Sequence, residues 1–345
     1  MPNLSEVLAK LTAKNKTMRQ KFNLGLAYLH FKARSIYLYS YPIRLNIDPC
    51  NYCNLQCALC PVGQRDKGRK QTLMTFDTYK KVLDECGPYL WEINLYNWGE
   101  PLLNKDVFKM IKYARGMKID VNLSTNLNIF NDEICNNLIK CKLNKLIVSL
   151  DGVSQKSVEA YQAGNNFEVV IENMKRLIQK KHELGSDLPF LEWRFIVHKH
   201  NEHGIDRAKE LAQELGVDKL EFLQIRCNMG QELLMNNKAQ FENVKPWLPK
   251  NENLSGYDYS KRQKKDIKDF CRLLWIESVI QPDGSVSPCC AVWQDKFDFG
   301  NIRDFSFKEI WNGEKYCAVR RLSRGEVVPD QGHICNICKV NQAQV

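Results

Sequence analysis

Long hydrophobic runs are absent from this sequence. No stretch approaches the roughly 18 to 20 unbroken apolar residues that a membrane span needs, since even LGLAYLHF is followed at once by Lys32 and Arg34. The first residues, MPNLSEVLAKLTAK, lack the apolar core and cleavage site of a secretory signal. We therefore expect a cytoplasmic protein without a membrane span.

Repeats and low-complexity tracts are absent as well. The 345 residues are 44% hydrophobic and 26% charged, an ordinary globular composition that excludes a disordered or collagen-like chain. Single hydrophobic cores stop growing at roughly 250 to 300 residues. We therefore expect one large domain and one smaller one.

Acidic residues are scarce at the N-terminus. Residues 1–45 hold eight Lys and Arg against one acid, Glu6, and so carry +7 of the total charge of +10. Such a segment suits contact with RNA, acidic lipid or an acidic partner. Apolar residues interleaved from Phe22 to Tyr41 favour the alternative, a helical arm over residues 1–42 that caps the domain. The rest of the chain has no RNA-recognition signature, so nucleic acid is not an expected partner.

Cysteine, in contrast, is abundant, with 14 residues. In a reducing compartment, closely spaced cysteines usually bind metal or carry redox chemistry. Cys53, Cys57 and Cys60 form C-x3-C-x2-C within DPCNYCNLQCALCP. Three thiolates on one loop can hold three corners of an iron–sulfur cube and leave the fourth iron open. The alternative is a zinc site that includes Cys50, which fits less well because zinc sites usually pair C-x2-4-C with a distant second pair.

Short apolar runs alternate with amphipathic helical stretches between residues 44 and 226, which predicts βαβ units and a parallel sheet. Thr75, Asn104 and Asn131 are expected helix N-caps. Six parallel strands with outer helices form an incomplete relative of the eight-stranded barrel, an α/β fold. The expected strands are 44–47, 91–96, 120–124, 145–150, 190–197 and 219–225.

The alternation stops after Arg226. Residues 228–270 are polar and are expected to form a connection rather than a core element. Beyond Cys271 the pattern predicts a small α+β extension, with a hairpin around Pro282 to Gly284 and a short helix capped by Ser306.

The segment CNLQCALCP resembles the signature of the radical S-adenosylmethionine (SAM) superfamily, in which SAM chelates the open iron of a [4Fe-4S] cluster. The resemblance covers residues 43–227 and implies a partial (β/α)6 barrel. It implies that three segments at strand ends contact SAM, together with an arginine on the fifth strand. These residues are Gly99, Glu100, Pro101, Ser124, Asn126, Ser149, Asp151 and Arg194.

Three positions depart from the family pattern. Trp98 stands where a glycine is usual, Leu59 replaces a common aromatic residue before the third cysteine, and Gln162 replaces a common arginine. None of the three is a cluster ligand.

A second cysteine group resembles the SPASM or twitch extension of the same superfamily, here over residues 271–345. The frame C-x12-G-x4-C is followed by a distant C-x2-C, and it implies one auxiliary [4Fe-4S] cluster. A zinc ribbon is the alternative and fits poorly, because ribbons use two close pairs. The implied ligands are Cys271, Cys289, Cys335 and Cys338. Cys317 is a candidate catalytic hydrogen-atom donor, or else a packing residue.

The resemblance implies an enzyme that reductively cleaves SAM to a 5′-deoxyadenosyl radical and abstracts hydrogen from its substrate. An external electron donor such as flavodoxin or ferredoxin is then required. Because residues 1–42 are few for a peptide-recognition domain, we expect a small polar substrate, such as a sugar or aminocyclitol, that is dehydrogenated or epimerised. Peptide or protein maturation is the alternative, and a metal-stapled RNA-binding protein is the alternative from another class.

Overall fold

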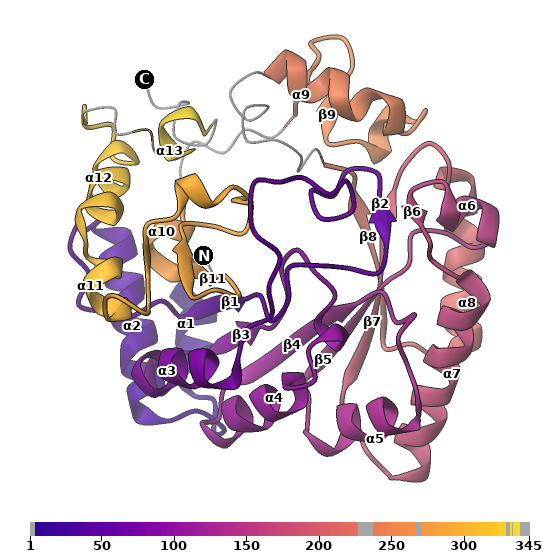
Figure 1. The fold of residues 1–345 in the computed structure, drawn as a ribbon, viewed down its shortest axis with the longest axis horizontal. Coiled ribbons are helices and arrows are strands. Elements are labelled where there is room, and N and C mark those ends of the chain that lie inside the picture. The colour runs from indigo at the N-terminus through magenta and orange to yellow at the C-terminus, as the bar shows by residue number, and fades with distance from the viewer. Residues whose placement is uncertain (1–3, 227–236, 266–270, 329–331, 333, 339–345) are drawn as a thin grey trace.

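One nine-stranded sheet organises the molecule (Figure 1). The computed structural model describes residues 4–226, 237–265, 271–328, 332 and 334–338. All neighbouring strands from β11 to β8 run parallel, and the last two, β12 and β13, are antiparallel. The order across the sheet is β13 (Gly300–Asn301), β12 (Ser285–Ser287), β11 (Glu277–Ile280), β1 (Arg44–Ile47), β3 (Glu92–Asn94), β4 (Asp120–Thr125), β5 (Lys145–Ser149), β7 (Phe190–Val197) and β8 (Lys219–Gln224).

The six expected parallel strands are confirmed as β1, β3, β4, β5, β7 and β8. The sequence did not predict that β11 of the extension pairs with the free edge of β1, with Arg44 opposite Glu277 and Ile47 opposite Ile280. Core and extension therefore share one hydrogen-bonded sheet.

Helices follow the strands and cover the outer face of the sheet (Figure 1). Leu45, Ile93 and Leu123 alternate along their strands and bury their side chains in the core on this face. The helices that follow strands are α3 (Phe76–Cys86), α4 (Val107–Gly116), α5 (Asp132–Lys140), α6 (Gln155–Glu159), α7 (Phe167–Glu183) and α8 (Ile205–Leu215). The extension adds α10 (Leu273–Ile276), α11 (Phe307–Trp311), α12 (Glu314–Leu322) and α13 (Ile334–Ile337).

Two of the three expected barrel caps are confirmed. Thr75 and Asn131 accept hydrogen bonds from the third backbone N–H of α3 and α5. The Asn104 prediction is wrong, because α4 begins at Val107 with Asp106 as its N-cap. The Asn104 side-chain oxygen accepts the Asp106 N–H at 2.9 Å in the turn before α4, and its amide donates to the carbonyls of Pro49 and Met74 at 2.7 and 2.9 Å. The expected Ser306 cap of α11 is also confirmed.

The N-terminal arm forms α1 (Leu4–Leu11) and α2 (Met18–Lys32). Gln20 donates to the carbonyl oxygens of Leu90 and Met117, and Lys16 donates to those of Trp91 and Lys118. These carbonyls immediately precede β3 and β4. The arm therefore closes the N-terminal end of the barrel.

The polar segment contributes a core element, contrary to expectation. Its described part contains α9 (Asn237–Val244) and the hairpin β9 (Tyr257–Asp258) with β10 (Gln263–Lys264). Phe241, Tyr257 and Leu248 share a buried cluster with Leu59 and Tyr161 of the barrel. Residues 228–270 are polar on average, but the few large apolar residues among them cover the first cysteine loop.

No helix within the described ranges is long and apolar enough to cross a membrane.

Candidate functional site

The first cysteine loop is fastened to the barrel by main-chain contacts. Within it, β2 (Gln56–Cys57) pairs antiparallel with β6 (Gln162–Ala163), and the Ala58 N–H donates to the Tyr161 carbonyl at 2.9 Å. Figure 1 shows the loop crossing from β1 to β2, beside β6. A Cβ atom at Gly63 would lie 2.5 Å from the Cys57 nitrogen, so only glycine permits this closure.

Cys53, Cys57 and Cys60 meet on this loop. Burial raises the pKa of each thiol, to about 12 for Cys53, and neighbouring thiols of the trio raise the pKa of Cys53 and Cys57 further. A raised pKa favours the protonated thiol, whereas bound iron favours the thiolate, because thiols lose their protons when they coordinate a metal cation. Three sulfur donors with no other ligand type among them fit an iron–sulfur cube with one open iron.

Cys50, the fourth residue of the zinc alternative, is fully buried below the loop. Its thiol donates to the Tyr52 carbonyl at 3.1 Å. Among the residues described, no group of three or more His, Cys, Asp or Glu side chains is placed to hold a single metal ion.

The Gly99–Pro101 segment packs directly against the backbone around Cys50. A Cβ atom at Gly99 would lie 1.9 Å from the Cys50 carbonyl oxygen, so any other residue would displace this contact. The Glu100 N–H donates to the Tyr52 carbonyl at 3.0 Å. The segment is thus held beside the cysteine loop, as its predicted role in binding SAM requires.

The Glu100 carboxylate is buried and faces β4. It accepts hydrogen bonds from the Thr125 hydroxyl and the Asn126 N–H, both at 2.8 Å. Burial raises the pKa of Glu100 to about 7, and these hydrogen bonds oppose the rise. The Asn126 amide in turn donates to Asn54 at 2.8 Å and to the Cys53 sulfur at 3.7 Å. A chain of contacts therefore joins Glu100 to a predicted cluster ligand.

Ser124, Ser149 and Asp151 lie at the ends of the next strands. The two serine hydroxyls are 3.2 Å apart across β4 and β5. Gln162 donates to the Ser149 carbonyl at 3.2 Å and accepts from the Asp151 N–H at 2.9 Å. The glutamine that replaces the family's arginine thus fixes the end of β5 relative to the cysteine loop.

Arg194 points into the barrel from β7 but is already paired. Its guanidinium donates to Glu192 at 2.6 Å and lies 3.6 Å from Glu221. The buried Nε atom has no hydrogen-bond partner among the described residues. Burial opposes its charge, but the nearby Tyr96 hydroxyl and Glu192 carboxylate hold the pKa of Arg194 above its usual value, so the charge that the predicted contact with the SAM carboxylate needs is kept.

The inner face of the barrel is polar, which the sequence reasoning did not foresee. Asn122 donates to Asn94 at 3.0 Å, Asn94 to Asn46 at 2.7 Å, and Asn46 to Glu277 at 2.6 Å. Arg44 binds Glu277 in the same layer. The signal was present in the polar residues at every second position of RLNI, EIN and DVNLST.

The second group of cysteines comes from three separate segments. Cys271 precedes α10, Cys289 follows β12, Cys335 lies on α13 and Cys338 follows it. Burial raises the pKa of Cys289 and Cys335, and the nearby thiols of Cys271 and Cys338 raise both further. Four convergent sulfurs fit a fully ligated cluster.

The remaining cysteines of the extension lie differently. Cys290 is exposed beside Cys289. Cys317 lies on α12, at the outer edge of the molecule in Figure 1, and its thiol donates to the Asn312 carbonyl at 3.2 Å. The structure does not bring Cys317 together with the SAM-binding candidates, which favours packing over the predicted catalytic role. Cys227 falls outside the described residues.

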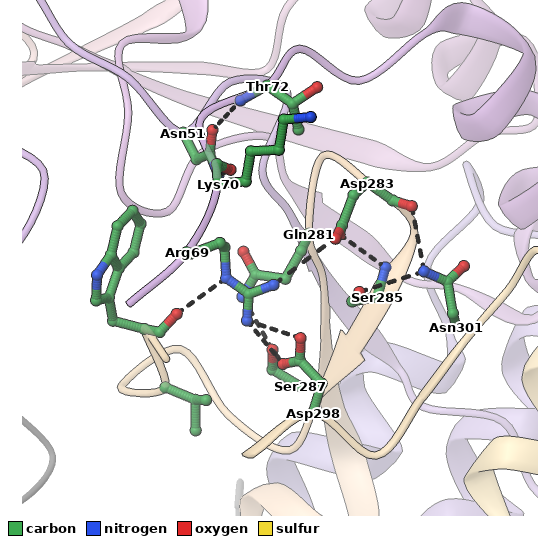
Figure 2. A network of polar contacts seen from close by, with 12 residues as sticks. Asn51, Arg69, Lys70, Thr72, Gln281, Asp283, Ser285, Ser287, Asp298 and Asn301 are labelled. Atoms are coloured by element: carbon green, nitrogen blue, oxygen red, sulfur yellow. Dashed lines mark hydrogen bonds and ion pairs between the residues drawn. The ribbon is translucent and has the colours of Figure 1, made fainter. Parts of the chain in front are cut away.

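A buried polar contact joins the two cysteine sites. The Arg69 side chain, 2% exposed, follows the first loop and reaches into the extension (Figure 2). It donates to the Trp293 carbonyl at 2.9 Å and forms an ion pair with Asp298 at 2.8 Å. Ser287, two residues before Cys289, donates to the same carboxylate at 2.5 Å.

Trp98 contributes to the same junction. Its indole N–H donates to the Val292 carbonyl at 3.2 Å, and its ring meets that of Trp293 edge-on at 6.0 Å. The Trp293 indole donates to Asp66 at 2.9 Å. The residue that departs from the family's glycine therefore anchors the segment that follows Cys289.

Comparison with known proteins agrees with this arrangement. Residues 47–189 match the family model of the radical SAM superfamily, and residues 271–339 match SPASM, an iron–sulfur cluster-binding domain. The two models together span more than half of the sequence, so the chain belongs to the radical SAM superfamily of enzymes. Within that superfamily it is one of the enzymes that carry a SPASM domain.

Curated relatives match over most of the chain. The tungsten-containing aldehyde ferredoxin oxidoreductase cofactor-modifying protein of Pyrococcus furiosus is 22% identical, over 87% of this chain and 88% of its own. The PqqA peptide cyclase of Bradyrhizobium diazoefficiens is 26% identical, over 81% and 75%. The SAM-bound crystal structure of Streptococcus suis SuiB aligns with a TM-score of 0.63 at 17% identity, over 88% and 72%. This last likeness shows the fold alone.

Proposed function

We propose that this radical SAM enzyme acts on a small polar substrate held within the barrel. When bound at Cys53, Cys57 and Cys60, the first cluster and SAM supply an electron and a 5′-deoxyadenosyl radical that removes a hydrogen atom from the substrate. The observation that carries the substrate class is the polar inner face. Amide and carboxylate groups of Asn46, Asn94 and Glu277 can exchange hydrogen bonds with a hydroxyl-rich molecule.

The proposed binding residues lie at two depths within the barrel. Gly99 to Pro101, Ser124, Asn126, Ser149, Asp151 and Arg194 lie toward the carboxyl ends of their strands and are proposed to hold SAM. The amide chain from Asn46 to Asn122 lies deeper and is proposed to orient the substrate below SAM. The cover formed by Phe241, Leu248 and Tyr257 over Leu59 excludes water from the cysteine loop.

Dehydrogenation is the favoured outcome of hydrogen abstraction. Epimerisation needs a hydrogen-atom donor at the substrate, and the candidate thiol of Cys317 is instead engaged by the carbonyls of Asn312 and Ile36. Peptide modification is the second candidate, and the relative named PqqA peptide cyclase supports it. The RNA-binding alternative is set aside, because the family match makes the chain a radical SAM enzyme.

An external donor is proposed to approach the first cluster from outside the barrel. A cavity of about 770 Å³ opens beside Cys53 and is lined by residues 52–56, 62, 63, 65–67 and 69–71. Arg65, Lys67 and Lys70 are exposed on its wall and suit an acidic flavodoxin or ferredoxin. Changing Arg65, Lys67 and Lys70 together to glutamate should repel an acidic protein donor. This variant is expected to slow SAM cleavage driven by flavodoxin and to leave cleavage driven by dithionite unchanged.

The test of the function is anaerobic reconstitution followed by measurement of iron and 5′-deoxyadenosine. We expect about eight iron atoms per chain if both sites hold cubane clusters, and 5′-deoxyadenosine when SAM and reductant are supplied. Sugars and aminocyclitols deuterated at carbon are then screened against linear peptides. Deuterium in 5′-deoxyadenosine from a peptide alone would overturn the substrate class, and bound zinc without SAM cleavage would overturn the whole proposal.

A further inference from the structure

The exposed side of α2 is apolar, which is unusual for a surface helix. Met18, Phe22 and Leu29 are 78%, 74% and 63% exposed, whereas the opposite side buries Gln20 and Asn23 with Leu24 and Ala27. At 100° per residue, Met18, Phe22 and Leu29 fall within a stripe about 40° wide. The buried side of this helix thus includes two polar residues, Gln20 and Asn23, while three large apolar residues face outward.

Cations border this stripe on both sides. Lys21 and Lys32 lie along one edge and Arg19 along the other, while α2 contains no acidic residue. Within the described part of the chain these three cations form no ion pair, and the Lys32 ammonium lies 5.7 Å from the centre of the Tyr28 ring. Lys10 and Lys14 are exposed on the preceding segment. The aromatic rings of Tyr37 and Tyr39, 53% and 74% exposed, follow the helix.

We infer that α2 is a peripheral membrane-binding surface that recognises an anionic lipid bilayer. An apolar stripe between rows of cations matches the boundary between acyl chains and negatively charged headgroups. Tyrosines beside the stripe suit the headgroup level. The stripe is convex rather than a groove, and two of its three residues, Met18 and Leu29, have no ring on which a base could stack, so it fits hydrocarbon better than single-stranded RNA.

A second copy of the chain fits this surface less well. A self-complementary contact over the stripe would bring Arg19, Lys21 and Lys32 close to the same cations of the other copy, with no acid on α2 to compensate. Anionic lipid, in contrast, supplies the missing negative charge along both edges.

The position of α2 sets the orientation of the bound enzyme. The buried side of α2 contacts the segments that precede β3 and β4, so the helix lies at the N-terminal end of the barrel. The first cysteine loop lies at the opposite end. Docking through α2 therefore leaves the mouth of the barrel facing the aqueous phase, and the enzyme is held near a membrane without drawing its substrate from the lipid.

The test is sedimentation of the full chain with vesicles of phosphatidylcholine alone or with phosphatidylglycerol. We expect binding only with phosphatidylglycerol, and weaker binding as salt rises. The double variant Phe22→Ser/Leu29→Ser removes the apolar anchor and is expected to lower binding at least about tenfold. The variant Arg19→Gln/Lys21→Gln/Lys32→Gln is expected to lower it to a similar degree.

Val169→Ser is the matched control, because Val169 is a 39% exposed apolar residue of α7, which lies across the molecule from α2 (Figure 1). It should bind vesicles like the wild type. Absence of wild-type binding at low salt, or unchanged binding of the Phe22→Ser/Leu29→Ser variant, would overturn the inference. So would a dimer that this variant converts to a monomer, or salt-sensitive binding to single-stranded RNA without binding to vesicles. Each variant is compared by circular dichroism, so that loss of folding is recognised.

Discussion

The two cysteine sites are built in opposite ways. The first takes three cysteines from eight consecutive residues, and contacts from β6, Gly99 and Asn126 then hold that loop in place. The second gathers four cysteines from residues 271 to 338, and β12, α10 and α13 bring them together. The first site is therefore a local loop fixed by its surroundings, whereas the second exists only when the extension is folded.

The largest effect is expected at the first site. Cys57→Ala removes a ligand that its neighbours in the loop cannot replace, and it should abolish 5′-deoxyadenosine formation. Iron should fall from about eight to about four atoms per chain, since the second site is separate. Cys50→Ser is the matched control and should keep both iron and activity, because serine can still donate to the Tyr52 carbonyl. Turnover in Cys57→Ala at the wild-type rate would refute the assignment.

A change at the second site should separate cleavage from product formation. Cys335→Ala is expected to retain SAM cleavage, to lose product and again to hold about four iron atoms. Cys317→Ala serves as control and should form product normally, because its thiol contacts the carbonyls of Ile36 and Asn312, away from the SAM-binding candidates. Product formation that survives in Cys335→Ala would make the second site purely structural.

The junction between the sites can be broken with both cysteine sets intact. Arg69→Met leaves the buried Asp298 carboxylate without its cation and should lower the free energy of unfolding by about 3 to 5 kcal/mol. Asp298→Asn added to it should recover part of the loss, as anaerobic urea denaturation would show. Lys70→Met changes an exposed neighbouring cation and should have little effect. A loss that Asp298→Asn does not relieve would contradict the pairing.

The smallest expected effect is a pH-dependent change in the free energy of unfolding at Asp151. Burial raises the pKa of Asp151 from 3.8 to about 7. The folded protein therefore binds the Asp151 proton more tightly than the unfolded chain does. The contribution of protonated Asp151 to the free energy of unfolding is complete below about pH 4 and is lost as the pH rises to about 7. Between pH 5 and pH 8, Asp151→Asn should consequently gain about 2 to 3 kcal/mol of unfolding free energy over the wild type.

Asp187→Asn, at an exposed loop position, gives the matched control for urea denaturation at both pH values. It should show the same difference from the wild type at pH 5 and pH 8. A wild type that gains stability over Asp151→Asn between pH 5 and pH 8 would contradict the raised pKa.

Sequence alone predicted what is periodic or local. The six parallel strands and the caps at Thr75, Asn131 and Ser306 follow from patterns within a few residues. The Asn104 cap prediction missed the helix start by two residues, because the Asn104 side chain accepts the Asp106 N–H in a turn that precedes α4. Pairing of β11 with β1 joins residues 233 positions apart, and no local pattern encodes it.

The same distinction, between local patterns and contacts distant in sequence, applies to the candidate site. The cysteine spacing singled out the groups of thiols that the structure brings together, while the amide chain of Asn46, Asn94 and Asn122 becomes evident only when the strands are placed side by side. The sequence showed that Trp98 departs from the family pattern. Its structural role became clear only from its hydrogen bond to the Val292 carbonyl in the extension. Contacts between segments distant in sequence account for what was missed.

The pairing of β11 with β1 also limits how this protein can be divided. A chain that stopped before Cys271 would expose the backbone N–H and carbonyl groups along the edge of β1, in the middle of what is now a continuous sheet. Unpaired strand edges of this kind recruit strands from other molecules. The barrel and its extension match separate family models yet share one sheet, so genetic truncation at their boundary should yield aggregates rather than a minimal enzyme.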